Sequence, residues 1–171
     1  DTLRRRYQSL WIGEAVAITL FVFLLLRAAL QEGIWQHWVA RTYSLGVVIL
    51  ILLQGIVWWR WKLQRLRTGQ RHMPAHVLDS FRAWRRINWL LIAGFPLLVV
   101  IASQWTDQPL ASRDTWFGLL ILVGAVLEQI NYYYFQLMYD SAYDIAYLRA
   151  HRRLRRASIA QALDAHDQHV S

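Results

Sequence analysis

Several polar side chains stand inside otherwise apolar segments, and they are the residues whose types could do chemistry. They are Glu14, Gln54, Asn88, Glu128 and Asn131, with Tyr132 beside the last of them. Carboxyl and carboxamide groups are costly to place in hydrocarbon without partners, so such residues either join helices or mark a path for protons, ions or substrates. We weigh both readings: a buried hydrogen-bond network, and a site that opens to the cytoplasm.

The spacing of the last of these residues predicts which face of their helix makes contacts. One side of this helix holds residues spaced three or four apart. They are Gly124, then Glu128, then Asn131 and Tyr132. A small residue near a carboxyl group on one face is typical of a contact between membrane helices. We expect Glu128 to be paired, and the expected partners are Arg85 or Arg86, Asn88 and a tyrosine hydroxyl.

The residue types that are absent exclude most enzyme chemistry. The chain has no cysteine, which removes thiolate metal sites and a cysteine nucleophile. None of the apolar segments contains a histidine, so a haem held between two helix histidines is excluded. The sequence also lacks phosphate-binding, serine-hydrolase and zinc-protease motifs. We therefore predict no catalytic residue, no metal and no cofactor.

Four apolar segments must position the polar residues. They run over residues 10–26, 43–59, 87–105 and 116–134. A bilayer is crossed by about 20 apolar residues in helical form, and these segments are apolar nearly all round. The sequence therefore predicts an all-α polytopic membrane protein, with a four-helix transmembrane bundle over 1–138 and a basic helical tail over 139–171.

The basic residues predict how the chain is threaded. The 171 residues carry a formal charge of +8, and 16 of the 19 lysines and arginines lie before the first segment, between the second and third, or after the fourth. Cytoplasmic loops carry such an excess, so both termini and the middle loop are predicted to be cytoplasmic. The same residues predict contact with anionic lipid headgroups at that face. Because topology accounts for the charge, we do not predict nucleic-acid binding.

Local signals predict where the helices begin and end. Gly69 is expected to end the helix of the second segment, and Pro74 to lie in the first turn of the next helix. Pro96 predicts a kink. Residues 31–42 predict a short interfacial helix, and Ser158 with a glutamine three residues later predicts a capping box.

The stretch from residue 127 onward, LEQINYYYFQLMYDSAYDIAYLRAHRRLRRASIA, resembles a known signature. It is similar to the C-terminal part of a family of small bacterial four-span membrane proteins, loosely catalogued as general stress proteins, and the opening RRYQSLWIGE resembles that family's start. The resemblance implies a bacterial inner-membrane protein without an established activity. The positions that it singles out are Glu14, Glu128, Asn131, Tyr132, Tyr133, Gln136 and Asp140.

These observations predict a non-enzymatic inner-membrane protein that acts by assembling, either with itself or as an accessory subunit of a larger membrane complex. The alternative is a small oligomeric transporter or channel that uses Glu128 as its coupling residue. A third possibility is an intramembrane enzyme acting on a lipid or a quinone, which would need a lipid-sized cleft beside Glu14 and Glu128.

Overall fold

The computed structural model describes the chain except for residues 1, 33–34, 70–72, 107–108, 139–141 and 171. The described residues are almost entirely helical, as the apolar segments predict. The elements are α1 (Thr2–Glu32), η1 (Trp35–Trp38), α2 (Val39–Thr68), α3 (Ala75–Thr106), α4 (Arg113–Tyr133), α5 (Ala142–His151) and α6 (Ser158–Val170).

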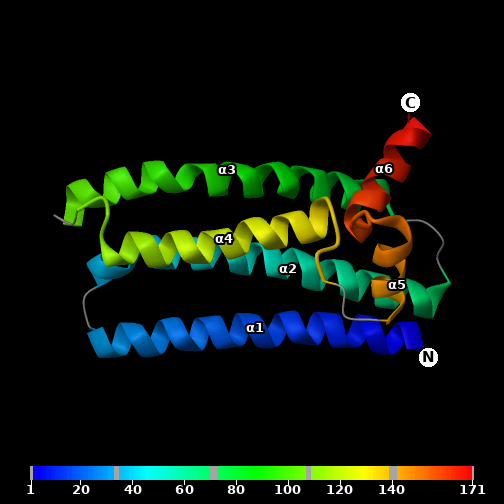
Figure 1. The fold of residues 1–171 in the computed structure, drawn as a ribbon, viewed down its shortest axis with the longest axis horizontal. Coiled ribbons are helices and arrows are strands. Elements are labelled where there is room, and N and C mark those ends of the chain that lie inside the picture. The colour runs from blue at the N-terminus through cyan, green and yellow to red at the C-terminus, as the bar shows by residue number, and fades with distance from the viewer. Residues whose placement is uncertain (1, 33–34, 70–72, 107–108, 139–141, 171) are drawn as a thin grey trace.

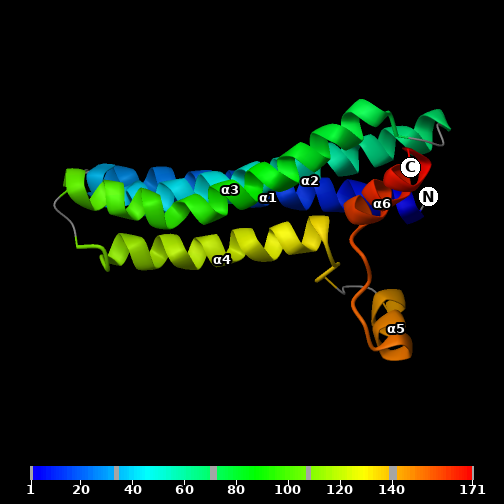
Figure 2. The same ribbon diagram turned by 90° about the horizontal axis from the view of Figure 1, so that it is seen from above.

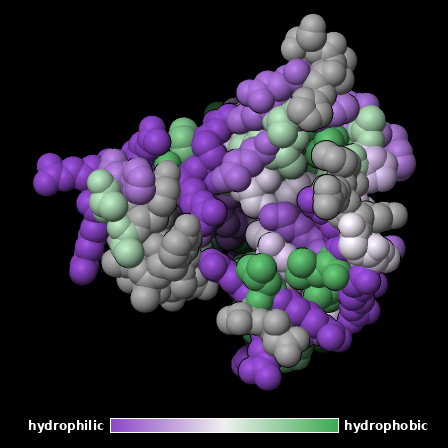
Figure 3. Space-filling model, turned by 90° about the vertical axis from the view of Figure 1, so that its right-hand side faces the viewer, coloured by the Kyte–Doolittle hydropathy of each residue, from purple (hydrophilic) through white to green (hydrophobic). Residues whose placement is uncertain are grey.

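The helices α1 to α4 are each long and apolar enough to cross a membrane, which confirms the predicted polytopic fold class. Three of them are longer than a bilayer requires. The 30 residues of α2 span about 45 Å, against about 30 Å of hydrocarbon, so its basic last turns extend past the apolar layer. Both chain ends and the connection between α2 and α3 lie at the same end of the molecule (Figure 1), which we call the basic end; hydrophilic residues cover much of it (Figure 3).

The helix α2 is the centre of the bundle. It lies between α1 and α3 in one layer, and α4 packs against it from one face of that layer (Figures 1 and 2). Half of the apolar window of α2 is buried, whereas only 6% of the window of α1 is buried. Ile51 and Trp58 are among the most deeply buried side chains of the molecule. The other spanning helices therefore expose long apolar faces, as a protein surrounded by lipid or by other helices requires.

At the opposite end, α4 is anchored to the start of α2 by a buried carboxylate. Asp114 accepts hydrogen bonds from the backbone N–H of Ala40 at 2.7 Å and of Arg41 at 3.3 Å, and from Nε of Arg41 at 2.7 Å. A negative charge is favourable there because the first N–H groups of a helix have no partners within the helix. One turn on, Gly118 lies so close to Ala40 that a Cβ would come within 2.8 Å of that residue's backbone.

This anchor decides which face of α4 is buried, and it corrects our prediction. The buried positions are Asp114, Gly118, Leu122, Ala125, Gln129, Tyr132 and Tyr133. The predicted contact face holds Gly124, Glu128, Asn131 and Tyr132; of these Tyr132 is buried, whereas the other three are only partly buried. The close approach at Gly118 rotates α4 about its axis, so that Gln129 points inward where Glu128 was expected to do so.

The predicted helix ends are largely confirmed. The helix α2 ends at Thr68, and Gly69 follows with a φ of 68°, a left-handed conformation that suits glycine. Pro74 directly precedes α3, which continues through Pro96 as one helix. Among the described residues of 31–42, the short 3₁₀ helix η1 lies between the end of α1 at Glu32 and the start of α2 at Val39.

The last helix, α6, begins at Ser158 as predicted, but the capping box does not form. The hydroxyl of Ser158 accepts hydrogen bonds from Nε1 of Trp58 at 2.8 Å and from Nζ of Lys62 at 2.6 Å. Gln161 donates to the carbonyl of Arg156 instead. The helix α6 packs against α3 and α4, with Ile159, Ala160 and Leu163 buried. Part of the predicted tail thus closes the basic end of the bundle.

Candidate functional site

Three carboxamide side chains meet in the interior of the bundle. Gln54 of α2 and Asn88 of α3 exchange hydrogen bonds, from Gln54 Nε2 to Asn88 Oδ1 at 3.0 Å and from Asn88 Nδ2 to Gln54 Oε1 at 2.9 Å. Nδ2 of Asn88 also donates to Oε1 of Gln129 on α4 at 2.8 Å. None of the three is more than 2% exposed. One asparagine therefore joins three membrane-spanning helices.

Two further groups complete this cluster, which we call the buried amide network: Gln54, Asn88, Gln129 and Tyr133. The hydroxyl of Tyr133 donates to Oε1 of Gln54 at 2.7 Å. Nε2 of Gln129 donates to the backbone carbonyl of Arg85 at 3.1 Å. The network is neutral, and its amide groups find partners inside the protein, as buried polar groups must.

The sequence places these groups through the ordinary spacing of buried helix positions. Gln54 lies three residues after Ile51 and four before Trp58 on the buried face of α2. Asn88 lies seven residues from both Phe81 and Phe95, the buried aromatic residues of α3. Intervals of three, four and seven residues return to the same side of a helix. Apolar packing thus positions each amide, and the hydrogen bonds then fix the register between helices.

A second cluster, which we call the Glu14 cluster, joins α1 to the rest of the bundle through Glu14, Trp59 and Tyr132. Oε1 of Glu14 accepts a hydrogen bond from Nε1 of Trp59 at 2.7 Å and another from the hydroxyl of Tyr132. Its other oxygen, Oε2, is buried and has no hydrogen-bond partner among the described residues. The cluster leaves room only for glycine at position 55, because a Cβ there would lie 2.5 Å from Oε2 of Glu14 and 2.6 Å from Tyr132.

Glu128 and Asn131 form a third pair on α4. Glu128 lies one turn before Tyr132 and is near enough to Glu14 for the two acidic side chains to interact electrostatically. Nδ2 of Asn131 donates to Oε2 of Glu128 at 3.4 Å, and its Oδ1 accepts from the backbone N–H of Leu137 at 2.9 Å. The predicted charge partners of Glu128 are wrong: over the described ranges of the chain neither Arg85 nor Arg86 forms an ion pair with it.

The predicted polar residues are therefore brought together only in part. The buried amide network takes Gln54 and Asn88, and the Glu14 cluster takes Tyr132. Glu128 with Asn131 lies beside the Glu14 cluster, without a hydrogen bond to it among the described residues. The sequence analysis missed Gln129 and Trp59 and singled out Tyr133 only by resemblance. The signal for Gln129 was its spacing of four and seven residues from Ala125 and Leu122, which are buried on the same face.

Two other positions implied by the resemblance have no place in these clusters. Nε2 of Gln136 donates to the carbonyl of Met138 at 2.8 Å, and its backbone N–H donates to the carbonyl of Arg155 at 2.8 Å. Asp140 lies outside the described residues. Gln136 thus connects the end of α4 with the chain that leads into α6.

Among the residues that the structure describes, no group of three or more histidine, aspartate or glutamate side chains could hold a metal ion. The acidic side chains Glu14 and Glu128 lie near each other, and the hydroxyl of Tyr132 is hydrogen-bonded to Glu14. What the geometry can do is hold helices in register.

Comparisons with protein-family models, with curated proteins and with solved structures find no match to this chain. The resemblance to four-span stress proteins therefore stays a prediction, and function must be argued from the clusters themselves.

The contact at Gly55 yields a direct test of the Glu14 cluster. We expect Gly55→Ala to lower the melting temperature in mild detergent, because the new methyl group forces Glu14 and Tyr132 apart at a cost of about 1–3 kcal/mol. Gly46→Ala is the matched control on the same helix, since a Cβ there meets nothing within 4 Å. Equal melting temperatures for the two variants would show that α1 does not pack on α2 in this way.

Proposed function

We propose that this chain is a non-enzymatic integral membrane protein that acts by assembling with other membrane-spanning helices, either those of a second copy or those of a larger membrane complex. The support comes from a polar group that the bundle covers only in part. Glu128 is not fully buried, and its hydrogen-bond partner among the described residues is Asn131 of its own helix.

A carboxyl group that a spanning helix leaves partly exposed is costly in contact with lipid tails. Glu128 lies in the second half of α4, and large exposed apolar side chains accompany it along that helix. Leu120 is 68% exposed, Val123 50% and Leu127 52%. A facing helix that offers a hydrogen-bond donor would satisfy Glu128 and cover these side chains at the same time.

The apolar faces of α1 and α3 favour the same proposal. Very little of the apolar window of either helix is buried, and α1 is held chiefly by α2. Helices with so little buried apolar surface offer the rest of it to other helices as well as to lipid. We place the protein in the bacterial inner membrane with both termini in the cytoplasm, on the basis of the charge asymmetry and the family resemblance.

The assembly proposal predicts a cross-link that depends on Glu128. Because the chain has no cysteine, Val123→Cys can carry a single benzophenone maleimide on the exposed face of α4. We expect illumination of membranes to yield a cross-linked protein adduct. Its mass should be at least twice that of the chain if the neighbour is a second copy, or the mass of the chain plus that of a partner protein if the neighbour is a larger complex. Adding Glu128→Leu should remove most of the adduct, because the polar contact is lost.

The control for this experiment is Leu127→Ala, which trims the neighbouring exposed side chain and leaves the carboxyl group in place. We expect that variant to keep most of the protein adduct. If the label at position 123 reacts with lipid alone, or if the adduct is indifferent to Glu128→Leu, this face of α4 is a lipid-facing surface and the proposal fails.

The second candidate is a small oligomeric transporter or channel that uses an inner-leaflet polar cluster around Glu128. The observation in its favour is the carboxyl group of Glu14, whose buried Oε2 has no partner among the residues that the structure describes. Such an oxygen can hold a proton in the interior of a membrane protein. In this reading Glu14 and Glu128 would take up and release protons within an oligomer.

A flux measurement separates the two candidates. The assembly proposal predicts that vesicles containing the purified protein and an internal pH-sensitive dye leak protons no faster than protein-free vesicles. Proton flux that Glu14→Gln or Glu128→Gln abolishes, and that Gln104→Ala on the exposed side of α3 leaves intact, would establish the transporter instead.

A further inference from the structure

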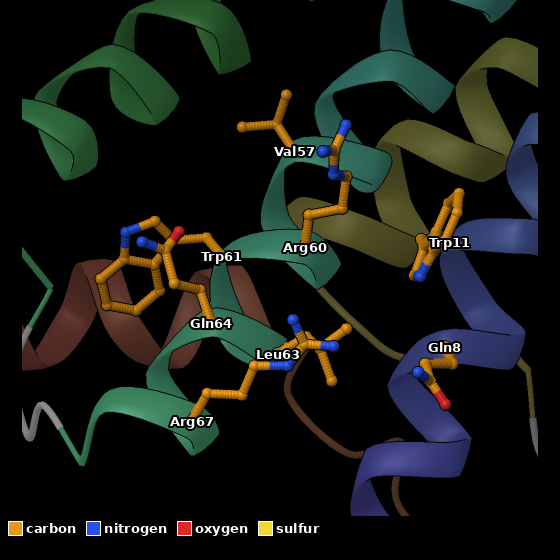
Figure 4. Close-up of a pocket in the computed structure, with 8 residues that line it drawn as sticks. All are labelled: Gln8, Trp11, Val57, Arg60, Trp61, Leu63, Gln64 and Arg67. Atoms are coloured by element: carbon orange, nitrogen blue, oxygen red, sulfur yellow. The ribbon is translucent and has the colours of Figure 1, made fainter.

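An open pocket with a volume of about 750 Å³ lies between the first turns of α1 and the last turns of α2 (Figure 4). It sits at the basic end of the molecule, where the chain changes from apolar to basic. The side chains that matter for its chemistry are Gln8, Trp11, Val57, Arg60, Gln64 and Arg67. It is separate from the buried amide network and from the outer face of α4.

The α2 side of the pocket changes character along the helix. Val57, Arg60, Gln64 and Arg67 follow one another at intervals of three or four residues, so they share one face. Leu53, one turn earlier on that face, is 46% exposed, and Val57 is 44% exposed. The face thus runs from apolar side chains at membrane depth to two guanidinium groups at the helix end.

No acidic side chain lines the pocket among the residues that the structure describes. Arg60 and Arg67 are both exposed, and the described part of the chain gives neither of them an ion pair with a carboxylate. Guanidinium groups carry only hydrogen-bond donors, and they suit carboxylate or phosphate oxygens. The pocket therefore offers two positive charges that its own residues do not neutralise.

The α1 side contributes a donor that lacks an acceptor. Nε1 of Trp11 is buried, and no hydrogen-bond partner for it is present among the described residues. An indole N–H can only donate, and a buried donor without a partner is unfavourable by about 1–3 kcal/mol. Gln8 lies one turn before Trp11, so both side chains face the pocket from α1 (Figure 4).

We propose that this pocket binds the phosphate group of an anionic glycerophospholipid from the leaflet at the basic end. Arg60 and Arg67 would neutralise the phosphate, and Nε1 of Trp11 would donate to one of its oxygens or to an ester oxygen of the same lipid. The acyl chains would continue along Leu53 and Val57. This inference does not rest on the assembly proposal, because the site is complete within one chain.

The order of side chains favours a lipid over a soluble phosphate compound. A soluble anion would use the guanidinium groups alone and would leave the apolar part of the face uncovered. A lipid matches both parts of the face, and the arginines supply the preference for a negatively charged headgroup. A pocket of this volume also falls within the range of about 300–1,000 Å³ that small-molecule sites occupy.

The test is lipid binding by the delipidated full chain, measured by native mass spectrometry. We expect phosphatidylglycerol to bind at least about tenfold more tightly than phosphatidylcholine, which carries the same phosphate with a positive headgroup. Arg60→Gln combined with Arg67→Gln should remove that preference. The matched control is Arg86→Gln combined with Arg149→Gln, which removes two exposed charges elsewhere and should retain it.

A second variant tests the pocket without a change of charge. Trp11→Phe keeps an aromatic ring and removes the N–H group, and we expect it to weaken phosphatidylglycerol binding by about three- to tenfold while the melting temperature of the lipid-free protein is unchanged or higher. Equal binding of the two lipids, or an intact preference in the Arg60/Arg67 variant, would overturn the proposal. Full competition by glycerol phosphate would also overturn it, because the ligand would then be a soluble phosphate.

Discussion

A carboxamide cannot lie in the apolar interior of a membrane protein without hydrogen-bond partners, and the structure depends on that constraint. Apolar side chains alone would let α2, α3 and α4 slide past or rotate against one another at small cost, since lipid tails are as apolar as leucine. Gln54, Asn88 and Gln129 remove that freedom. Asn88 bonds to both glutamines at once, so a shift of any one helix breaks a hydrogen bond of a buried group.

The other contacts extend from the same part of α2. Gly55 follows Gln54 and admits the Glu14 cluster, which attaches α1. One turn on, Trp58 bonds to Ser158 and so holds α6 across the basic end. At the far end of α2, Asp114 fixes the start of α4. The central helix is therefore a scaffold, and the surfaces that remain for function are the outer face of α4 and the pocket between α1 and α2.

The sequence predicted the spans and the helix end at Gly69 because length, hydropathy and glycine conformation are local properties. It also identified Gln54, Asn88 and Glu14 as polar residues inside apolar segments. It did not predict the rotation of α4, since the choice between Glu128 and Gln129 as the inward residue depends on the approach of Gly118 to Ala40, two positions 78 residues apart. It likewise could not place Ser158 beside Trp58, because that contact joins segments far apart in the chain.

The measurement that tests this account most directly is a double-mutant cycle between Asn88 and Gln129, with the free energy of unfolding measured by steric trapping in bicelles. The account predicts that Asn88→Ala and Gln129→Ala are each destabilising and are coupled by about 1 kcal/mol, the strength of a hydrogen bond between membrane helices. The control pair, Asn88→Ala with Gln104→Ala on the exposed side of α3, should be additive. Additive effects of Asn88→Ala and Gln129→Ala would contradict the account, because the two side chains would then not be bonded to each other.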